Sequence, residues 1–77
     1  MRSYRTRVAV LTPHLAAVAG RQPRAQETPG ATRIEVGVPL RLGEPGRRAL
    51  LVALAEADRY GHDITADGET VWAEIDQ

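Results

Sequence analysis

The stretch that decides the fold is Thr-Ala-Asp-Gly-Glu-Thr, residues 65–70, which separates two runs of alternating apolar and polar residues. Asp67 and Gly68 suit the two-residue type I′ loop of a β-hairpin, because both central residues of that loop need positive φ. With these two residues as the loop, the first pair across the hairpin is Ala66 and Glu69. The sequence therefore predicts two antiparallel strands joined by a tight turn.

This register sorts the side chains of the hairpin into two sets, because directly opposed residues share a face. One set is mainly apolar and is expected to face the core: Tyr60, His62, Ile64, Val71, Ala73 and Ile75. The other set is mainly polar and is expected to face outward: Asp63, Thr65, Thr70, Trp72 and Glu74. A slip of one residue would mix the two sets, so the turn and the hydrophobic pattern support the same pairing.

The segment before the hairpin has the pattern of an amphipathic helix from about Pro45 to Asp58. A proline in the first turn loses no intrahelical hydrogen bond, and Gly61 is expected to end the helix. The apolar stripe consists of Leu50, Leu51, Ala53, Leu54 and Ala57. Val52 and Ala55 widen this stripe beyond what one sheet face needs, which indicates a partner surface.

Residues 32–38, Thr-Arg-Ile-Glu-Val-Gly-Val, alternate strictly and predict a half-buried strand with Ile34, Val36 and Val38 inward. The order from residue 32 onward is therefore β-α-β-β. We expect an α+β fold, a small two-layer domain over residues 32–77 in which one helix packs on a sheet that contains the antiparallel hairpin.

Residues 1–31 are expected to form a basic N-terminal arm and linker that is in part disordered. Tyr4–Leu11 alternates at its start and allows an extra strand, and residues 12–19 allow a short helix. Residues 21–31 are polar and have the composition of an exposed linker. Three residues there interrupt regular structure: Pro23, Pro29 and Gly30.

Length and composition narrow the class of protein. A chain of 77 residues forms one domain whose core supplies only about 3–5 kcal/mol, so self-association or a bound partner is expected. The chain has no cysteine, which excludes disulfides and thiolate metal sites. No run approaches the roughly 18 apolar residues of a membrane span, so we expect a cytoplasmic protein that does not enter a membrane.

The net charge is zero, but the charges are unevenly distributed along the chain. Residues 1–26 hold five arginines and no acid, whereas residues 54–77 hold one arginine and seven acids. The basic segment suits a nucleic-acid backbone without sequence preference, or it serves only as a solvated arm. Its arginines are Arg2, Arg5, Arg7, Arg21 and Arg24.

A second route to DNA binding starts from the strand and helix. Ribbon-helix-helix dimers begin with this order and would offer Arg33, Glu35 and Gly37 to the major groove. That class needs a second helix after the first, and the turn at Asp67 and Gly68 predicts strands there instead. A small DNA-binding regulator therefore stays an alternative mainly through the arginine arm.

Four segments carry a resemblance to a protein group: Thr32-Arg-Ile-Glu-Val-Gly-Val-Pro, Arg47-Arg-Ala-Leu-Leu, Ala57-Asp-Arg-Tyr-Gly-His-Asp and Thr70-Val-Trp-Ala-Glu-Ile. They resemble uncharacterised small proteins of GC-rich actinobacteria. The resemblance covers residues 32–77 and leaves the N-terminal segment unmatched. It implies a bacterial cytosolic origin, and it carries no activity, cofactor or functional residue with it.

The hairpin also holds a weak calcium pattern, D-x-[DN]-x-[DN]-G-x₅-E. Its metal candidates are Asp63, Asp67 and Glu74, with Gly68 at the sharp turn. The third loop position is Thr65 rather than an acid or amide, and too few residues follow for an exiting helix. A calcium-binding hairpin is therefore the weaker alternative, and no cofactor is expected.

Two further side chains are candidates for a functional role. His62 is expected to be a partly buried structural histidine, because the only other histidine, His14, lies across the linker. Trp72 is expected on the outer, polar face of the sheet, where large aromatics anchor interfaces. The alternative is that the N-terminal segment covers it.

These features favour a small non-enzymatic interaction or accessory module. The chain has no nucleophile motif and no phosphate-binding glycine loop, and its single serine is Ser3. Self-association or a protein partner is expected to use Trp72, Val52 and Ala55.

Overall fold

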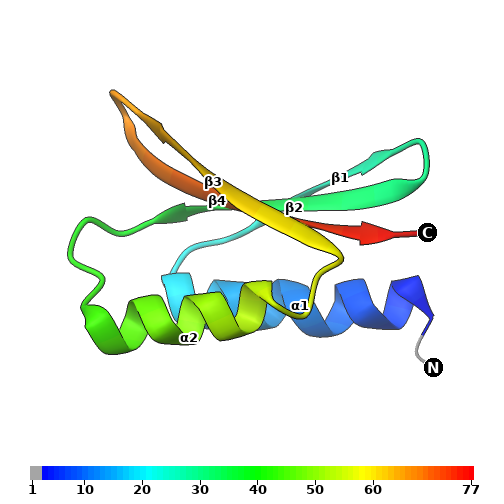
Figure 1. Cartoon of the computed structure of the whole chain (residues 1–77), viewed down its shortest axis with the longest axis horizontal. Helices are drawn as coiled ribbons and strands as arrows, with labels where there is room; N and C mark the ends of the chain where they lie inside the picture. The colour runs from blue at the N-terminus through cyan, green and yellow to red at the C-terminus, as the bar shows by residue number, and fades with distance from the viewer. Residues whose placement is uncertain (1–2) are drawn as a thin grey trace.

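Four antiparallel strands form one sheet, and two helices lie side by side against the same face of it (Figure 1). The structure is a computed structural model that describes residues 3–77. In chain order the elements are α1 (Tyr4–Ala19), β1 (Arg24–Thr28), β2 (Ala31–Val38), α2 (Glu44–Leu54), β3 (Arg59–Thr65) and β4 (Gly68–Asp76). The predicted two-layer α+β class is confirmed, with one helix and one strand more than the predicted 32–77 domain holds.

The strand order in the sheet is β1-β2-β4-β3. β2 and β4 are the central strands, and they place Ile34 opposite Ala73 and Val36 opposite Val71 on the helix side. β1 and β3 are the two edges. The core lies between the central strands and the helices: Leu11, Leu15, Ala19, Ile34, Val36, Val38, Leu50, Ala53, Leu54, Val71, Ala73 and Ile75.

The β3–β4 hairpin forms as predicted, but its register differs by two residues. Thr65 lies opposite Gly68, so Ala66 and Asp67 are the loop. A type I′ turn does not form, because no residue other than glycine between Ser3 and Gln77 has positive φ. The Thr65 hydroxyl instead accepts the Asp67 N–H at 3.2 Å and donates to the Gly68 carbonyl at 3.2 Å. A shift of two keeps every side chain on its predicted face.

Residues Tyr4–Ala19 form one helix, so the extra strand that the sequence allowed at Tyr4–Leu11 is wrong. Ser3 caps the helix by accepting the N–H of Thr6, and Gly20 ends it in the left-handed conformation with φ 67°. Leu11, Leu15 and Ala19 recur every four residues and are buried. This stripe packs against the sheet, and that burial outweighs the local alternation and the internal Pro13.

The segment predicted as an exposed linker also belongs to the sheet. β1 pairs with β2 from Arg24 opposite Glu35 to Thr28 opposite Ala31, and the two residues between form the turn. The boundary expected near residue 31 therefore falls inside a hairpin. The described part of the predicted arm contributes to the same core as the rest of the chain.

α2 is shorter than predicted and ends at Leu54, with Ala55 as its C-cap. Gly61 is a residue of β3 rather than the helix stop. The chain turns instead at residues 55–58, where the Asp58 N–H donates to the Glu74 carbonyl at 2.9 Å and starts the last hairpin. In the described part of the chain no helix is long and apolar enough to cross a membrane.

Candidate functional site

The two edges of the sheet differ in their protection against further strand pairing. β1 has five residues, is exposed and polar, and lies between Pro23 and Pro29. β3 has seven residues and no proline, and two large apolar side chains are exposed on it: Tyr60 at 48% and Ile64 at 74%. Prolines and charges are the usual protection of an edge strand. The β3 edge carries Arg59 and Asp63 but has no proline, and with its exposed apolar residues it is the less protected of the two.

An apolar groove runs beside this edge, between α2 and β3. It has a volume of about 310 Å³. The lining residues are Arg47, Leu50, Leu51, Leu54, Tyr60, Gly61, His62, Glu69 and Val71. Leu51 is 57% exposed although it belongs to the predicted apolar stripe of α2. Together, Leu51, Tyr60 and Ile64 continue the apolar character of the groove to the free edge.

A polar cluster closes one end of the groove. His62 Nδ1 lies 2.9 Å from a carboxylate oxygen of Glu69, and Arg47 reaches the same carboxylate at 3.5 Å. The hydrogen bond from His62, with a smaller contribution from the charge of Arg47, lowers the pKa of Glu69 below its usual value. His62 is on the predicted face, but its side chain is 60% exposed, so the prediction of a partly buried histidine is wrong.

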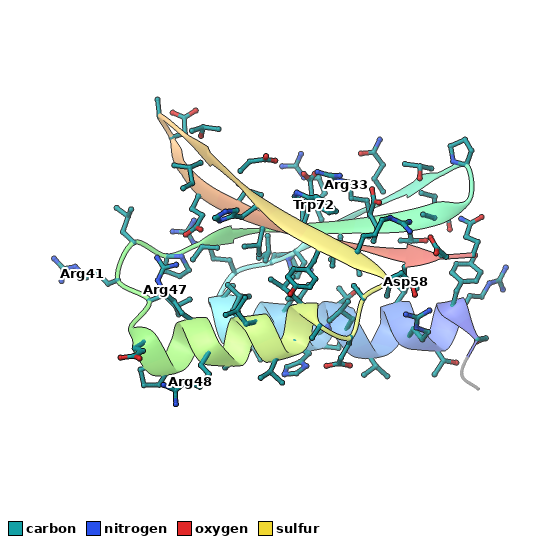
Figure 2. All side chains as sticks on the ribbon, viewed as in Figure 1. Arg33, Arg41, Arg47, Arg48, Asp58 and Trp72 are labelled. Atoms are coloured by element: carbon teal, nitrogen blue, oxygen red, sulfur yellow. The ribbon has the colours of Figure 1, made fainter. Side chains whose placement is uncertain are left out.

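Trp72 lies on the outer face of the sheet, as predicted, and Figure 2 shows it with Arg33 on the side away from the helices. The guanidinium carbon of Arg33 is 4.4 Å from the centroid of the indole ring. Gly61 lies directly opposite on β3, with the indole over its backbone. α1 is on the other side of the sheet, so the alternative in which the N-terminal segment folds back over Trp72 is wrong. Neighbours on the same face half-bury Trp72 instead.

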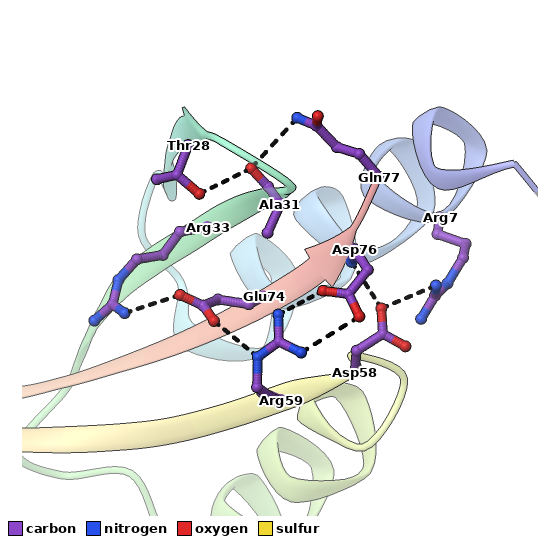
Figure 3. Close-up of polar contacts among 9 residues, drawn as sticks. All are labelled: Arg7, Thr28, Ala31, Arg33, Asp58, Arg59, Glu74, Asp76 and Gln77. Carbon is purple, nitrogen blue, oxygen red and sulfur yellow. Dashed lines mark hydrogen bonds and ion pairs between the residues drawn. The ribbon is translucent and has the colours of Figure 1, made fainter.

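An ion-pair network surrounds this outer face and ties it to α1 (Figure 3). Arg59 binds both Glu74 and Asp76, and Glu74 also accepts a hydrogen bond from Arg33 at 3.3 Å. Hydrogen bonds, first from Arg59, lower the pKa of Glu74. These pairs neutralise most of the charge around Trp72, and arginines engage both carboxylate oxygens of Glu74.

A second ion pair joins α1 to the start of β3. Arg7 lies 3.1 Å from Asp58, whose other hydrogen bond comes from the backbone N–H of Asp76 at 2.8 Å. The Arg7 hydrogen bond, followed by the backbone one, lowers the pKa of the Asp58 carboxyl. This contact fixes the first helix against the hairpin that ends the chain.

The residues predicted as one partner interface lie on two different surfaces. Val52 is 63% exposed and lies about 200° around α2 from the buried Leu50, so it points away from the sheet. Ala55 follows at the end of the same helix and is also exposed. Trp72 is on the opposite side of the two layers. The three side chains therefore form no single contact surface.

The arginines predicted to form a basic arm are spread over the molecule. Arg2 lies outside the described residues. Arg5 and Arg7 are in the first turns of α1, whereas Arg21 and Arg24 follow its other end, and a helix of 16 residues is about 24 Å long. Arg7 is paired with an acid. The described arginines of this set therefore make no single basic surface.

Another group of arginines, Arg41, Arg47 and Arg48, gathers near the start of α2 (Figure 2). Arg47 is paired with Glu69 and Arg48 with Glu44. Two of the three are therefore neutralised within the protein, and the group leaves little free positive charge for a phosphate backbone.

The candidate calcium ligands do not come together. Asp63 lies opposite Thr70 and Glu74 lies opposite Arg59, so the two acids are four strand positions apart, about 13 Å. Asp67 is in the loop, and both oxygens of Glu74 are engaged by arginines. Across residues 3–77 no group of three or more His, Asp or Glu side chains could hold a metal ion.

The exposed apolar edge is the feature that the sequence pattern misses. Tyr60 and Ile64 are on the predicted face, but the pattern does not show that β3 is an edge strand that α2 only partly covers. The sequence signal for a partner surface is the surplus of Val52 and Ala55 on α2, and it does not point to Leu51, which the pattern assigns to the core stripe. Comparison with protein-family models, curated proteins and solved structures finds no match to this chain.

Proposed function

We propose that this chain is a non-enzymatic association module that forms a homodimer through the free edge of β3 and the groove beside it. The observation that carries the proposal is the contrast between the two sheet edges. β1 is short, polar and bounded by prolines, whereas β3 is longer and exposes Tyr60 and Ile64. An edge of this kind favours pairing with another strand.

A second copy of the same chain suits this edge because of its charges. β3 carries Arg59 at its start and Asp63 near its end, and the loop that follows adds Asp67. A strand that pairs antiparallel with its own copy places the start of each strand beside the end of the other. The Arg59 end of one copy therefore lies beside the Asp63 end of its partner, and two-fold symmetry forms each contact twice. Arg59 also binds Glu74 and Asp76 of its own chain, so its attraction for the partner is shared with those acids.

The apolar side chains supply the driving force for association. Leu51, Tyr60 and Ile64 are all more than 40% exposed in the single chain. Full burial of such a side chain contributes about 1.5–3 kcal/mol, and a two-fold dimer brings six of them to its interface or to the border of it. Association also loses translational and rotational freedom at a cost of about 4–15 kcal/mol, so a dimer of moderate affinity is expected.

A non-enzymatic role is supported by the surroundings of the reactive groups. Ser3 caps α1. His14 binds Glu56 and His62 binds Glu69, and the two pairs are exposed on different elements. Nucleophilic catalysis needs a base within hydrogen-bond reach of a nucleophile. Neither histidine is beside a nucleophile in the described structure.

Sedimentation equilibrium at increasing protein concentration tests the proposal. The unmodified chain is expected to pass from monomer to dimer. Ile64→Lys places a charge on the free edge and should shift the equilibrium to monomer without loss of folded structure. Leu40→Lys is the matched control, because Leu40 is 90% exposed and lies in the loop before α2. A chain that stays monomeric at every concentration overturns the proposal.

A further inference from the structure

The symmetry of the proposed dimer restricts how the two β3 strands can pair. Residues directly opposite each other share a face of the sheet. The even-numbered side chains of β3 are on the helix side of the sheet. For the helices of both protomers to lie on the same side of one continuous sheet, even-numbered residues must therefore pair with even-numbered residues, and odd-numbered with odd-numbered. The two-fold axis must therefore lie between two copies of the same β3 residue, which are directly opposite each other, and we name the axis by that residue. The central choices are Gly61, His62 and Asp63.

Two of these choices fit the side chains poorly. An axis at Asp63 places the two carboxylates directly opposite each other, which is unfavourable, and moves Tyr60 beside the loop residue Ala66. An axis at Gly61 places Arg59 opposite Asp63, but Arg59 is already bound to acids of its own chain. It also places Ile64 beyond the start of the partner strand, where it has no strand residue opposite.

An axis at His62 fits the strand along its whole length. Tyr60 of each protomer then lies opposite Ile64 of the other. This pair occurs twice in the dimer, so both exposed apolar residues of each edge gain a partner. Gly61 lies opposite Asp63, and Arg59 lies opposite Thr65 and diagonal to Asp63. All seven residues of β3 have a partner in this register.

The two imidazoles that meet at the axis are already satisfied within their own chains. Each His62 is bound to Glu69, which also binds Arg47. Tyr60 is the other titratable group on this face of β3. Each imidazole lies beside the Glu69 carboxylate of its own protomer, so the His62 pair is compatible with a close approach.

We infer that the protein dimerises around a two-fold axis through His62, with Tyr60 of each protomer against Ile64 of its partner. This inference rests on the proposed function and specifies its geometry. Two four-stranded sheets become one continuous sheet with all the helices on one side. The groove at Leu51 then opens toward the partner, so that α2 borders the interface.

Cysteine cross-linking tests the register, because the chain contains no cysteine of its own. His62→Cys places two thiols opposite each other at the axis, within the Cα separation that a disulfide needs. With oxidised glutathione as oxidant, most of this variant should become a disulfide-linked dimer that reductant separates. Asp63→Cys, one residue along the strand and also exposed, should stay unlinked.

A mixed experiment guards against a change in folding at position 62. Tyr60→Cys and Ile64→Cys are prepared separately. Each should stay unlinked alone, and the mixture should form a linked heterodimer. If the unmodified chain is a dimer in sedimentation while Asp63→Cys links and His62→Cys does not, the register is wrong and the proposed function stands. If the unmodified chain is a monomer, both are overturned.

Discussion

The indole of Trp72 occupies the space that a side chain at Gly61 would fill. The two residues are directly opposite on β4 and β3, and a Cβ at position 61 would lie 2.7 Å from Cζ2 of the indole. Real Cβ atoms do not approach so closely, so residue 61 has to be glycine while the indole lies in this position. The position of Gly61 thus reflects a close contact on the outer face of the sheet.

Gly61→Ala is expected to displace the indole and to lower the free energy of unfolding by about 1–3 kcal/mol, as overpacking does. Trp72 is the only tryptophan, so its fluorescence reports the displacement directly. Urea unfolding monitored by the Trp72 fluorescence gives the free energy of unfolding and the displacement of the indole in one experiment.

Gly37→Ala is the matched control on the same face. An added Cβ there meets only the side chain of Arg21, with its nearest atom at 2.9 Å, and a flexible guanidinium can move away. The control should unfold close to the unmodified chain. Equal stability of the two variants would contradict the packing of Trp72 on Gly61.

Leu15→Ala is expected to unfold most of the protein. Leu15 is fully buried in the core from α1, and such truncations cost about 2–5 kcal/mol, which is comparable to the whole stability of a domain this small. Circular dichroism and urea unfolding measure the loss.

Leu40→Ala makes the same chemical change at a residue that is 90% exposed, and it should change stability little. A folded Leu15→Ala variant of unchanged stability would mean that α1 is a separate arm and not part of the core.

Asp58 links stability to pH. Its folded-state pKa is lowered, so its contribution is present above the ordinary carboxyl value of about 4 and is lost as the pH falls through the folded-state pKa. Asp58→Asn keeps an acceptor for the Asp76 N–H but removes the charge. We expect the unfolding free energy of this variant to fall less steeply than that of the unmodified chain between about pH 5 and pH 2.

Glu27→Gln is the control for this titration, because Glu27 is an exposed acid of β1 that pairs with no arginine in the described structure. This control removes one carboxylate and leaves the Arg7–Asp58 pair in place, so its slope is the reference for Asp58→Asn. An identical slope for Asp58→Asn would contradict the role of the Arg7–Asp58 pair.

Millimolar calcium is expected to leave the fluorescence of Trp72 unchanged. The acids that match the calcium pattern are separated along the strands, and Glu74 beside Trp72 is bound by Arg33 and Arg59. A saturable change that Asp63→Asn abolishes would contradict this geometry.

Local patterns in the sequence determined the faces of the strands and the existence of α2. Alternation with a period of two placed Val71, Ala73 and Ile75 inward and Trp72 outward, and the structure keeps each of them there. The pattern predicts faces well because side-chain direction depends only on the local backbone.

The position of the hairpin loop and the helical structure of α1 depended on more than the local sequence pattern. The loop shifted because Asp67 does not adopt positive φ and the Thr65 hydroxyl offered another set of hydrogen bonds. α1 became one helix because Leu11, Leu15 and Ala19 are buried against the sheet, a gain that no short window of sequence contains.

The sequence by itself determined a two-layer α+β domain, its hairpin and the inward and outward sets of side chains, because these follow from residue type and period. Only the tertiary structure decided that β3 is an edge. Strand order depends on pairing between segments far apart in the chain, as when β4 inserts between β2 and β3. That order leaves Tyr60 and Ile64 exposed although their pattern is that of core residues, and it creates the surface proposed for association.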